Sequence, residues 1–308
     1  MKKKNLFLVE TPFQLLNAVE AIHVFPAQQN DVQVRFSDSG KNDAQLKSLL
    51  QEISFSKNVI VKTFFIKSEK RSGFDFLKMC YYFLKFRLLT TRYKHVFIGN
   101  YDSRLIQLII PFTANTILLD DGLKTINIQK NFTPKKFYDW FTIFDLKPVK
   151  GQKIYSNQLT NLRTHIDKHG KKRKTILFIG SKLSEEKIIS EDYNIEIIKR
   201  AISHYSESSI TYVAHRSESQ RKLNKIQQIQ NVEVLQLPYP LELLPMYGEF
   251  SPTVIISFFS TALITLSKIY NVETIGYKFD FSKYPHRDNI ENAYKYCSQF
   301  ITVKELPL

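Results

Sequence analysis

Short runs of β-branched and aromatic residues alternate with longer segments of helical periodicity along the whole chain. The first run is Asn5–Val9, after which Thr11 and Pro12 provide an N-cap and a first helical position. Helices are expected at about 43–53 and 75–92. Further strands are expected at 32–36, 59–65, 95–99 and 116–119. This alternation predicts parallel βαβ units.

The polar, charged stretch Asp167–Lys174 interrupts this pattern, and it reads either as a linker between domains or as an ordinary surface loop. After it, helices are expected at about 191–204, 217–228 and 261–270. Strands are expected at 175–179, 210–214, 232–236, 253–257 and 274–277. A chain of 308 residues has room for two domains. We therefore predict two Rossmann-like α/β domains facing a central cleft, at 1–165 and 175–308.

Charge and cysteine content indicate the class of partner and the cellular compartment. The formal net charge of +15 favours anionic partners such as lipid surfaces, nucleic acid or small phosphorylated molecules. Cys80 and Cys297 are too few for a disulfide framework, which indicates a reducing cytoplasm. Glu10 and Pro12 interrupt the first apolar stretch, so we expect no signal peptide. No apolar run approaches the ~20 residues of a spanning helix, which favours a soluble or peripheral protein.

Two groups of aromatic residues lie beside basic residues, and each is either an interface with an anionic membrane or a buried aromatic helix with a solvated basic edge. The aromatic residues of the first group are Phe76, Tyr81, Tyr82, Phe83 and Phe86, and its basic residues lie at 67–71, 78, 85, 87, 92 and 94. The second group comprises Phe137, Tyr138, Trp140, Phe141 and Phe144, next to Lys135 and Lys136.

Polar residues follow the predicted strands, where the carboxyl ends of parallel strands form binding sites. They are Glu10, Thr11 and Gln14 after the first strand; Asp120, Asp121 and Gly122 after 116–119; Gly180, Ser181, Ser184, Glu185 and Glu186 after 175–179; His215, Arg216 and Ser217 after 210–214; and Ser257, Ser260 and Thr261 after 253–257. The sequence therefore predicts that the binding chemistry gathers at the carboxyl edges of two sheets.

Each of these groups also has an ordinary structural interpretation. The Asp120–Gly122 segment could be a plain turn in which glycine takes a positive φ. Glu185 and Glu186 could simply open a helix, and His215 could be a surface histidine. Ser260 and Thr261 could form only an N-cap, although that role is compatible with phosphate binding.

The segment from Ile255 to Leu263 is the best candidate for an anion site. An apolar strand ends at small hydroxyl residues and a helix follows, which presents backbone N–H groups and hydroxyls to a phosphate. The chain has neither the glycine fingerprint of dinucleotide binders nor a P-loop lysine. His215 can pass a proton to a leaving phosphate near neutral pH, and Arg216 follows it directly.

Other chemistries are poorly supported. The chain lacks a Gly-x-Ser-x-Gly nucleophile motif and carboxylates or histidines at metal-ligand spacing. It also lacks RNA-binding aromatic motifs and zinc spacings, so no nucleic-acid partner is expected.

Taken in order, the motifs resemble the bacterial sialyltransferases of glycosyltransferase family 52, the lipooligosaccharide type. The resemblance spans roughly residues 5–280. It is carried by Asn5–Gln14, Asp120–Gly122, Ile179–Ser181 with Glu185–Glu186, Tyr212–His215 and Ser257–Leu263. One departure is Arg216, which stands where the family usually has proline after the histidine.

The resemblance implies a GT-B fold with the nucleotide held mostly by the C-terminal domain. It implies inverting, metal-independent transfer of sialic acid from CMP-sialic acid to a glycan hydroxyl, with no cofactor. Glu185 or Glu186 would be the base and His215 the acid, while Ser257, Ser260 and Thr261 would bind the phosphate. Gly180, Ser181 and Arg216 would also contact the donor, and the expected sugar contacts are Thr11, Gln14, Asp120 and Asp121.

The same resemblance, together with the charge excess, implies a peripheral enzyme on the cytoplasmic side of an anionic inner membrane. Its acceptor would be a glycan or glycolipid of the lipooligosaccharide or capsule. Two rival interpretations remain from the residues alone: a GT-B enzyme that uses a UDP- or GDP-sugar, and a basic protein that binds lipid or nucleic acid without catalysis.

Overall fold

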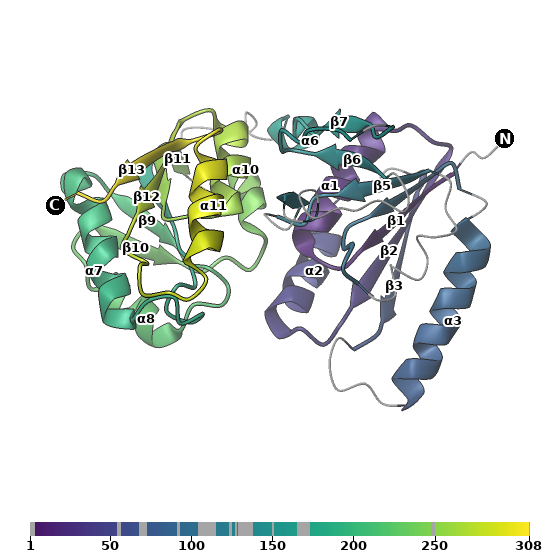
Figure 1. Cartoon of the computed structure of the whole chain (residues 1–308), viewed down its shortest axis with the longest axis horizontal. Helices are drawn as coiled ribbons and strands as arrows, with labels where there is room; N and C mark the ends of the chain where they lie inside the picture. The colour runs from purple at the N-terminus through teal and green to yellow at the C-terminus, as the bar shows by residue number, and fades with distance from the viewer. Residues whose placement is uncertain are drawn as a thin grey trace. The chain divides into compact units, whose positions relative to one another are not determined.

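The computed structural model describes residues 4–53, 57–67, 73–90, 93–103, 115–122, 125–126, 128, 138–149, 151–164, 173–247 and 250–307. The chain divides into two compact units. The N-terminal unit comprises Met1–Asn161 with Pro238–Pro240, and the C-terminal unit comprises Leu162–Leu237 with Leu241–Leu308. Figure 1 shows a sheet with helices packed on it in each unit.

The N-terminal unit contains a seven-stranded parallel sheet in the order β3-β2-β1-β4-β5-β6-β7. Its strands are β1 (Lys4–Val9), β2 (Gln29–Phe36), β3 (Val59–Phe65), β4 (His95–Ile98), β5 (Thr116–Leu119), β6 (Asp139–Thr142) and β7 (Ile154–Ser156). Its described helices are α1 (Pro12–Val24), α2 (Gly40–Glu52) and α3 (Gly73–Thr90), and α6 (Thr160–Arg163) follows where the chain passes to the other unit.

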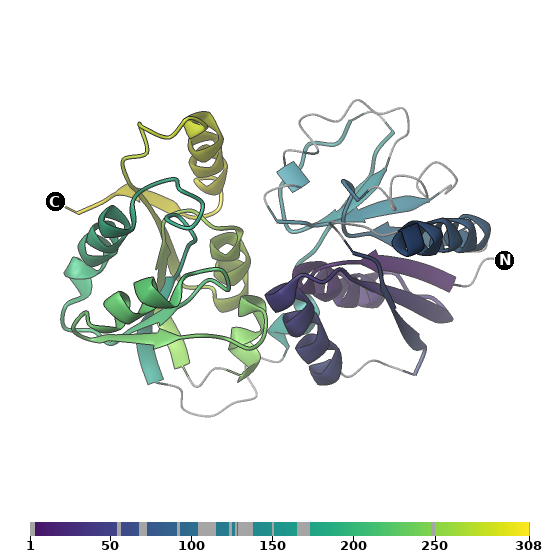
Figure 2. The ribbon, with the colours of Figure 1, turned by 90° about the horizontal axis from the view of Figure 1, so that it is seen from below.

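The C-terminal unit contains a six-stranded parallel sheet in the order β10-β9-β8-β11-β12-β13. Its strands are β8 (Arg173–Ile179), β9 (Ile210–Val213), β10 (Val232–Leu235), β11 (Phe250–Ser257), β12 (Glu273–Lys278) and β13 (Thr302–Glu305). Its α-helices are α7 (Glu191–Ile202), α8 (Gln220–Gln227), α9 (Leu244–Tyr247), α10 (Thr261–Tyr270) and α11 (Arg287–Cys297), with short 3₁₀ turns η3 (Ser203–Tyr205) and η4 (Leu241–Leu243). Figure 2 shows helices on both sides of this sheet.

Both sheets have the strand order of a Rossmann fold, so the predicted fold class is confirmed. In each sheet the first strand lies between the second and the fourth, and the direction of strand addition reverses there. This reversal falls between β1 and β4 in the N-terminal unit and between β8 and β11 in the C-terminal unit. Loops after these strands diverge and leave room for a ligand.

Two local signals of the N-terminal unit, a helix start and a turn glycine, also agree with the structure. Thr11 caps α1 by accepting a hydrogen bond from the backbone N of Gln14 at 3.3 Å, and Pro12 occupies the first turn. Gly122 has a φ of 66°, as a turn glycine should. Short-range capping and turn chemistry depends on neighbouring residues only, which is why the sequence was sufficient here.

The second aromatic group belongs to the core, so its interpretation as a membrane surface is wrong. Trp140 and Phe141 are 1% and 0% exposed. They lie on β6, which is hydrogen-bonded to β5 and β7 on its two sides. A parallel strand in this position is covered on both faces and therefore requires consecutive apolar residues. Lys135, Lys136 and Phe137 lie outside the described residues.

Several elements were not predicted from the sequence, among them β6, β7, α11 and β13. Residues 165–172 of the predicted linker lie outside the described part of the chain. Arg173 and Lys174, the last two residues of that stretch, instead begin β8. Their side chains are exposed at the strand's amino end, so a charged pair there is compatible with a buried strand.

No helix in the described part of the chain combines the length and the hydrophobicity needed to cross a membrane.

Truncation of a β6 aromatic residue should destabilise the protein. Phe141→Ala removes a fully buried ring and should lower the free energy of unfolding by about 3–5 kcal/mol. Phe76→Ala, on a ring that is 57% exposed, is the control and should change it by less than about 0.5 kcal/mol. Urea denaturation followed by circular dichroism measures both, and equal effects would argue against the buried position of β6.

Candidate active site of the C-terminal unit

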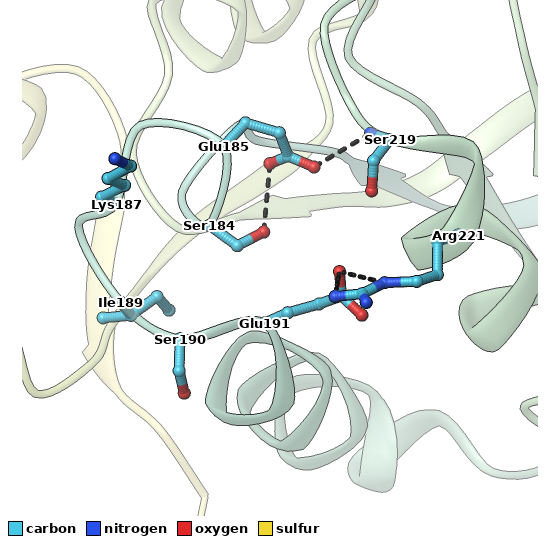
Figure 3. A pocket seen from close by; sticks show the side chains of 8 residues that line it. All are labelled: Ser184, Glu185, Lys187, Ile189, Ser190, Glu191, Ser219 and Arg221. Carbon is cyan, nitrogen blue, oxygen red and sulfur yellow. Dashed lines mark hydrogen bonds and ion pairs between the residues drawn. The ribbon is translucent and has the colours of Figure 1, made fainter.

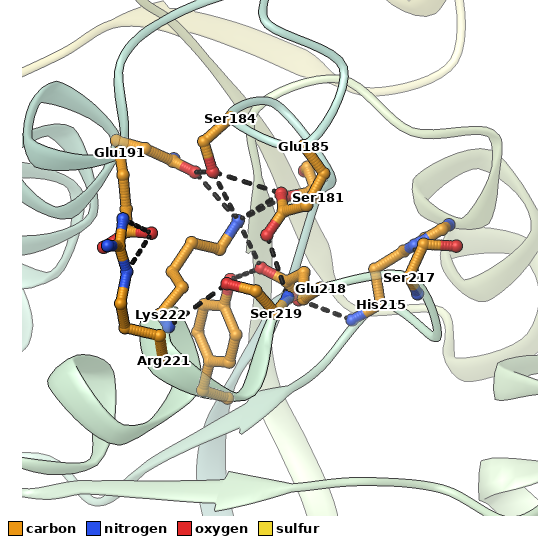
Figure 4. A network of polar contacts seen from close by, with 12 residues as sticks. Ser181, Ser184, Glu185, Glu191, His215, Ser217, Glu218, Ser219, Arg221 and Lys222 are labelled. Atoms are coloured by element: carbon orange, nitrogen blue, oxygen red, sulfur yellow. Dashed lines mark hydrogen bonds and ion pairs between the residues drawn. The ribbon is translucent and has the colours of Figure 1, made fainter.

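The carboxyl ends of β8, β9 and β11 lie side by side in the C-terminal sheet. Ile179 is paired with Val213, and Phe178 with Ile256, so the three strands end at the same level. The predicted site residues of this unit lie at these strand ends, in the loops that follow them or at the start of the next helix. Figure 4 shows the polar network that they form.

A buried lysine is the centre of that network. The side chain of Lys222, on α8, is 0% exposed. Its ammonium group lies 2.8 Å from Glu218 Oε1 and 3.0 Å from Glu185 Oε2. It also donates to the backbone O of Ser181 and to Asn194 Oδ1, both at 2.9 Å. A cation without water needs such partners, so Lys222 connects the loop after β8 with the N-termini of α7 and α8.

Glu218 extends the network to β9 and to His215. Its carboxylate accepts hydrogen bonds from Tyr212 Oη at 2.7 Å and from the backbone N of His215 at 2.6 Å. The same carboxylate lies against Gly180, where an added Cβ would collide with Glu218, Tyr212 and the backbone of Val213. Gly180 therefore serves close packing in this structure, a role different from the predicted donor contact.

Glu185 is held as an ion by its neighbours. Its carboxylate accepts from the backbone N of Ser219 at 2.9 Å, from Ser184 Oγ at 3.1 Å and from Lys222. Desolvation raises its pKa, but the hydrogen bonds from Ser219 and Lys222 outweigh it and leave the pKa below the ordinary value. This geometry favours a structural role for Glu185 over the predicted role as base. Glu186 is exposed and pairs with Lys182 at 2.5 Å.

His215 is neutral at physiological pH. Burial, reinforced by the positive charges of Arg216 and Lys182, lowers its pKa to about 4. The backbone N of Ser217 donates to Nδ1 at 3.1 Å, so the ring proton lies on Nε2. The neutral ring thus has one N–H group to offer to an oxygen. A bound phosphate would supply negative charge, which raises the pKa and turns the ring into a better proton donor.

Three hydroxyl residues lie where β11 ends and α10 begins. One of them is hydrogen-bonded within the sheet, and the other two lie at the start of the helix. Ser257 is fully buried and donates to the backbone O of Ile179 at 2.7 Å, so it joins β11 to β8. Ser260 caps α10 by accepting from the backbone N of Ala262 at 3.2 Å, and Thr261 is the first residue of the helix. Both are partly exposed, at the end of the helix that attracts anions.

Ser181 carries a further sign of a ligand. Its Oγ is buried and has no hydrogen-bond partner among the described residues. Buried hydroxyls are nearly always satisfied, and this one lies directly after β8, at the reversal of strand order. A phosphate or sugar oxygen would satisfy it, in line with the predicted donor contact.

A pocket of about 600 Å³ opens on the other side of the network (Figure 3). It lies between the turn at 183–188 and the first turns of α7 and α8, and two of its lining residues are acidic and two basic. They are Ser184, Glu185, Lys187, Ile189, Ser190, Glu191, Ser219 and Arg221. In Figure 4, Glu191 and Arg221 lie on one side of Lys222 and His215 on the other. The balanced charge makes this pocket a weaker phosphate site than the His215 side.

The N-terminal unit has its own polar cluster after β1 and β4. The carboxylate of Glu10 is paired with Arg35 at 2.7 Å, and it accepts from Asn100 Nδ2 at 2.7 Å and Ser103 Oγ at 3.0 Å. Arg35 belongs to β2, whereas Asn100 and Ser103 belong to the segment that follows β4. The carboxylate therefore holds the loops at the reversal of strand order together.

The four predicted sugar contacts of the N-terminal unit lie in unequal positions. Thr11 is the cap of α1. Gln14 is fully buried, with its amide donating to Asp121 Oδ1 at 2.8 Å and accepting from the backbone N of Glu10. Asp121 is partly exposed, and of the four it and Thr11 are the ones with surface left for a ligand.

Asp120 is 0% exposed. Its carboxyl group accepts from Thr142 Oγ1 at 2.6 Å and from the backbone N of Ile143 at 2.8 Å, which joins β5 to β6. Burial raises its pKa to about 7. This position favours a structural role for Asp120 over the predicted contact with a sugar.

In the described ranges, no group of three or more histidine, cysteine or acidic side chains is placed to hold a metal ion.

Sequence reasoning missed Lys222 and Glu218. Their spacing of four residues is the usual one for an ion pair on a helix, and an acid so close to His215 was a usable signal. The spacing does not show that the Lys222 and Glu218 side chains are buried, because ion pairs on exposed helix surfaces have the same spacing.

Comparisons with known proteins identify a family and a fold. The model of the family described as Alpha-2,8-polysialyltransferase (POLYST) matches residues 123–278, just over half of the chain. The matched segment includes Ser181, His215, Ser260 and Thr261. No curated protein sequence matches this chain.

Solved structures share the fold at very low sequence identity. UGT89C1 of Arabidopsis thaliana, complexed with UDP-L-rhamnose, is 9% identical with a TM-score of 0.59, and the match covers 100% of this chain and 87% of that one. The UDP-GlcNAc 2-epimerase of Methanocaldococcus jannaschii is 10% identical with a TM-score of 0.55, covering 98% and 89%. MurG of Acinetobacter baumannii is 10% identical with a TM-score of 0.50, covering 98% and 86%. The architecture is GT-B.

Removal of the central cation should destabilise the C-terminal unit strongly. Lys222→Met leaves two carboxylates without their buried partner and should lower the free energy of unfolding by about 3–5 kcal/mol. Lys225→Met is a matched control on the same helix, because Lys225 also pairs with two acidic residues but is 42% exposed. Its loss should stay below about 1 kcal/mol. Similar losses in urea denaturation would mean that Lys222 is not the buried centre of the network.

Proposed function

Because the chain belongs to the alpha-2,8-polysialyltransferase family, we propose that it transfers sialic acid from CMP-sialic acid to a glycan hydroxyl. It is a glycosyltransferase with the GT-B fold. The observation that carries the proposal is that the family match contains both groups of the C-terminal unit that can receive a phosphate, His215 and the N-terminus of α10. The more specific likeness to family 52 remains a prediction.

We propose that these groups stabilise the leaving phosphate. When CMP departs, negative charge develops on the phosphate and positive charge on the sugar. Nε2–H of His215 would donate to the phosphate, while Ser260, Thr261 and the first backbone N–H groups of α10 would bind its other oxygens. Arg216 would add a positive charge. Such donors would perform this step without a metal ion, with inversion at the anomeric carbon.

The base would take the proton of the acceptor hydroxyl as that oxygen attacks. Glu185 is held by the buried Lys222. Glu186 pairs with Lys182 at the exposed surface, where an ion pair is weak, so Glu186 is the predicted base in the C-terminal unit. Asp121 is a second candidate, since it is a partly exposed carboxylate after β5. We propose that the base is one of these two.

The acceptor would be a bacterial surface glycan, such as lipooligosaccharide or capsule. The family description further suggests that the attacked hydroxyl is O8 of a terminal sialic acid. We propose that the enzyme works in the cytoplasm at the inner membrane, where such acceptors are assembled on lipid. The charge of +15 favours both an anionic donor and an anionic surface.

Nucleotide binding separates this proposal from its rivals. A ligand present at a hundredfold excess over its Kd stabilises the folded protein by about 2.7 kcal/mol. We expect CMP to raise the melting temperature more than UDP or GDP does, as differential scanning fluorimetry would measure. A larger shift with UDP or GDP would indicate a different donor. No shift with any nucleotide, together with salt-sensitive binding to nucleic acid or lipid, would support a protein without catalysis.

The role of His215 is tested by two substitutions. His215→Ala should lower kcat for transfer from CMP-sialic acid by about 10²–10⁴-fold, because the leaving phosphate loses its donor. His215→Gln keeps an N–H near the position of Nε2 but cannot release a proton. If it restores most of the rate, the ring acts by hydrogen bonding and not as an acid. His204→Ala changes an exposed histidine and serves as the control. Unchanged turnover in His215→Ala would remove the proposed role.

A further inference from the structure

Helix α3 of the N-terminal unit has an apolar stripe on its outer face. Figure 1 shows α3 at the margin of the unit, drawn in blue. Five large apolar residues recur at intervals of three and four residues and are 56–71% exposed. They are Phe74, Leu77, Tyr81, Leu84 and Leu88. At 1.5 Å per residue the stripe is roughly 20 Å long, which exceeds the scattered exposure normal for a soluble surface.

The opposite face of α3 already has its partners. Phe86 is 1% exposed, and its ring lies 5.7 Å from that of Phe64 on β3. The ring of Tyr82 lies 4.6 Å from the same Phe64. The core of the unit therefore contacts the side chains of the inner face, and the apolar side chains of the stripe remain exposed. The first aromatic group divides accordingly, with Phe86 in the core and Tyr81 exposed.

Basic side chains border the stripe. The ammonium group of Lys78 lies 4.7 Å from the centre of the Phe74 ring, and that of Lys85 lies 5.9 Å from the Tyr81 ring. The lysines are seven residues apart, so they lie on the same flank of the helix. The acidic residue of α3 is Asp75, which is 7% exposed and so belongs to the inner face. The outer face is apolar with a positive border.

We propose that this face of α3 docks on an anionic lipid bilayer. Phe and Leu side chains would enter the boundary between headgroups and acyl chains, and Tyr81 would lie at the headgroup level. The lysines would reach back to anionic headgroups with their ammonium groups. The helix would lie in the interface, which agrees with the finding that no described helix is suited to cross a membrane.

A second copy of the chain fits this face less well. The spacing of the stripe is that of a coiled-coil seam, but such seams are specified by opposite charges on their flanks. Here the flank of the stripe carries Lys78 and Lys85, which are both basic. Self-pairing would bring like charges together, whereas an anionic bilayer would neutralise them. The charges therefore favour lipid.

The inference relies on the proposed location of the enzyme but on no step of the transfer reaction. Binding of the full-length protein to vesicles can be measured without donor or acceptor. Variants of the α3 face should transfer sialic acid to a soluble acceptor at the wild-type rate. A failure of vesicle binding is thus distinguishable from a failure of the proposed activity.

The first experiment measures co-sedimentation with phosphatidylcholine vesicles that contain or lack phosphatidylglycerol. Wild-type protein should bind the anionic vesicles more tightly than the neutral ones. Lys78→Ala with Lys85→Ala should weaken binding by about 30-fold, since each lysine near an anionic surface contributes about 1 kcal/mol. Lys41→Ala with Lys57→Ala removes two exposed lysines outside α3 and is the charge control. Equal effects of the two pairs would overturn the proposal.

The apolar stripe has a matched control of its own. Leu77→Gln with Leu84→Gln should weaken binding to anionic vesicles by about a hundredfold. Val24→Gln with Ile60→Gln changes two exposed aliphatic residues elsewhere in the unit, which are 52% and 41% exposed, and should leave binding unchanged. Thermal unfolding by circular dichroism shows whether each variant is folded. Binding that survives in the folded Leu77/Leu84 variant would overturn the proposal.

Fluorescence locates the contact directly. Trp140 is the single tryptophan of the chain and is 1% exposed, so a tryptophan at position 84 reports separately on α3. The emission of Leu84→Trp should shift to the blue when anionic vesicles are added.

Analytical ultracentrifugation without lipid tests whether a second copy of the chain binds this face instead. A dimer that is abolished by the Leu77/Leu84 substitutions, together with no vesicle binding, would show that the face pairs with a second copy.

Discussion

One buried ammonium group connects the loops from which the candidate site of the C-terminal unit is built. Lys222 has no contact with solvent, so its charge must be balanced within the protein. Its two carboxylate partners, Glu185 and Glu218, follow different strands of the sheet. Glu218 also receives the backbone N of His215. The position of the histidine thus depends on a charge that is fully buried, and a shift of α8 would move both loops together.

The carboxylates at the strand ends fall into two classes. Glu10, Asp120, Glu185 and Glu218 are engaged by donors from the surrounding loops and strands. Each joins segments that are distant in sequence, which is what a Rossmann sheet needs where its loops diverge. The remaining acidic side chains keep some surface. For Glu185 this engagement also limits the chemistry, because the hydrogen bonds from Ser219 and Lys222 lower its pKa and make its carboxylate a poorer proton acceptor.

Similar stretches of aromatic and basic residues ended in opposite environments. Trp140 and Phe141 lie in a strand that has a neighbour on each side and are buried, whereas Phe74 and Tyr81 are exposed on α3. Composition alone could not separate them, because both stretches combine large rings with neighbouring lysines. Strand pairing decided the first case, since β6 has a neighbour on each side. Helix geometry decided the second, since only one side of α3 can face the sheet.

The sequence by itself determined the βαβ order, most strand positions, the Thr11–Pro12 start of α1 and the set of loops that carry polar residues. These features follow from periodicity and from contacts between near neighbours. Only the tertiary structure decided which polar groups the fold uses internally. Lys222 and Glu185 are 37 residues apart, and Ser257 and Ile179 are 78 residues apart. Contacts over such distances depend on strand order and burial, which no local pattern encodes.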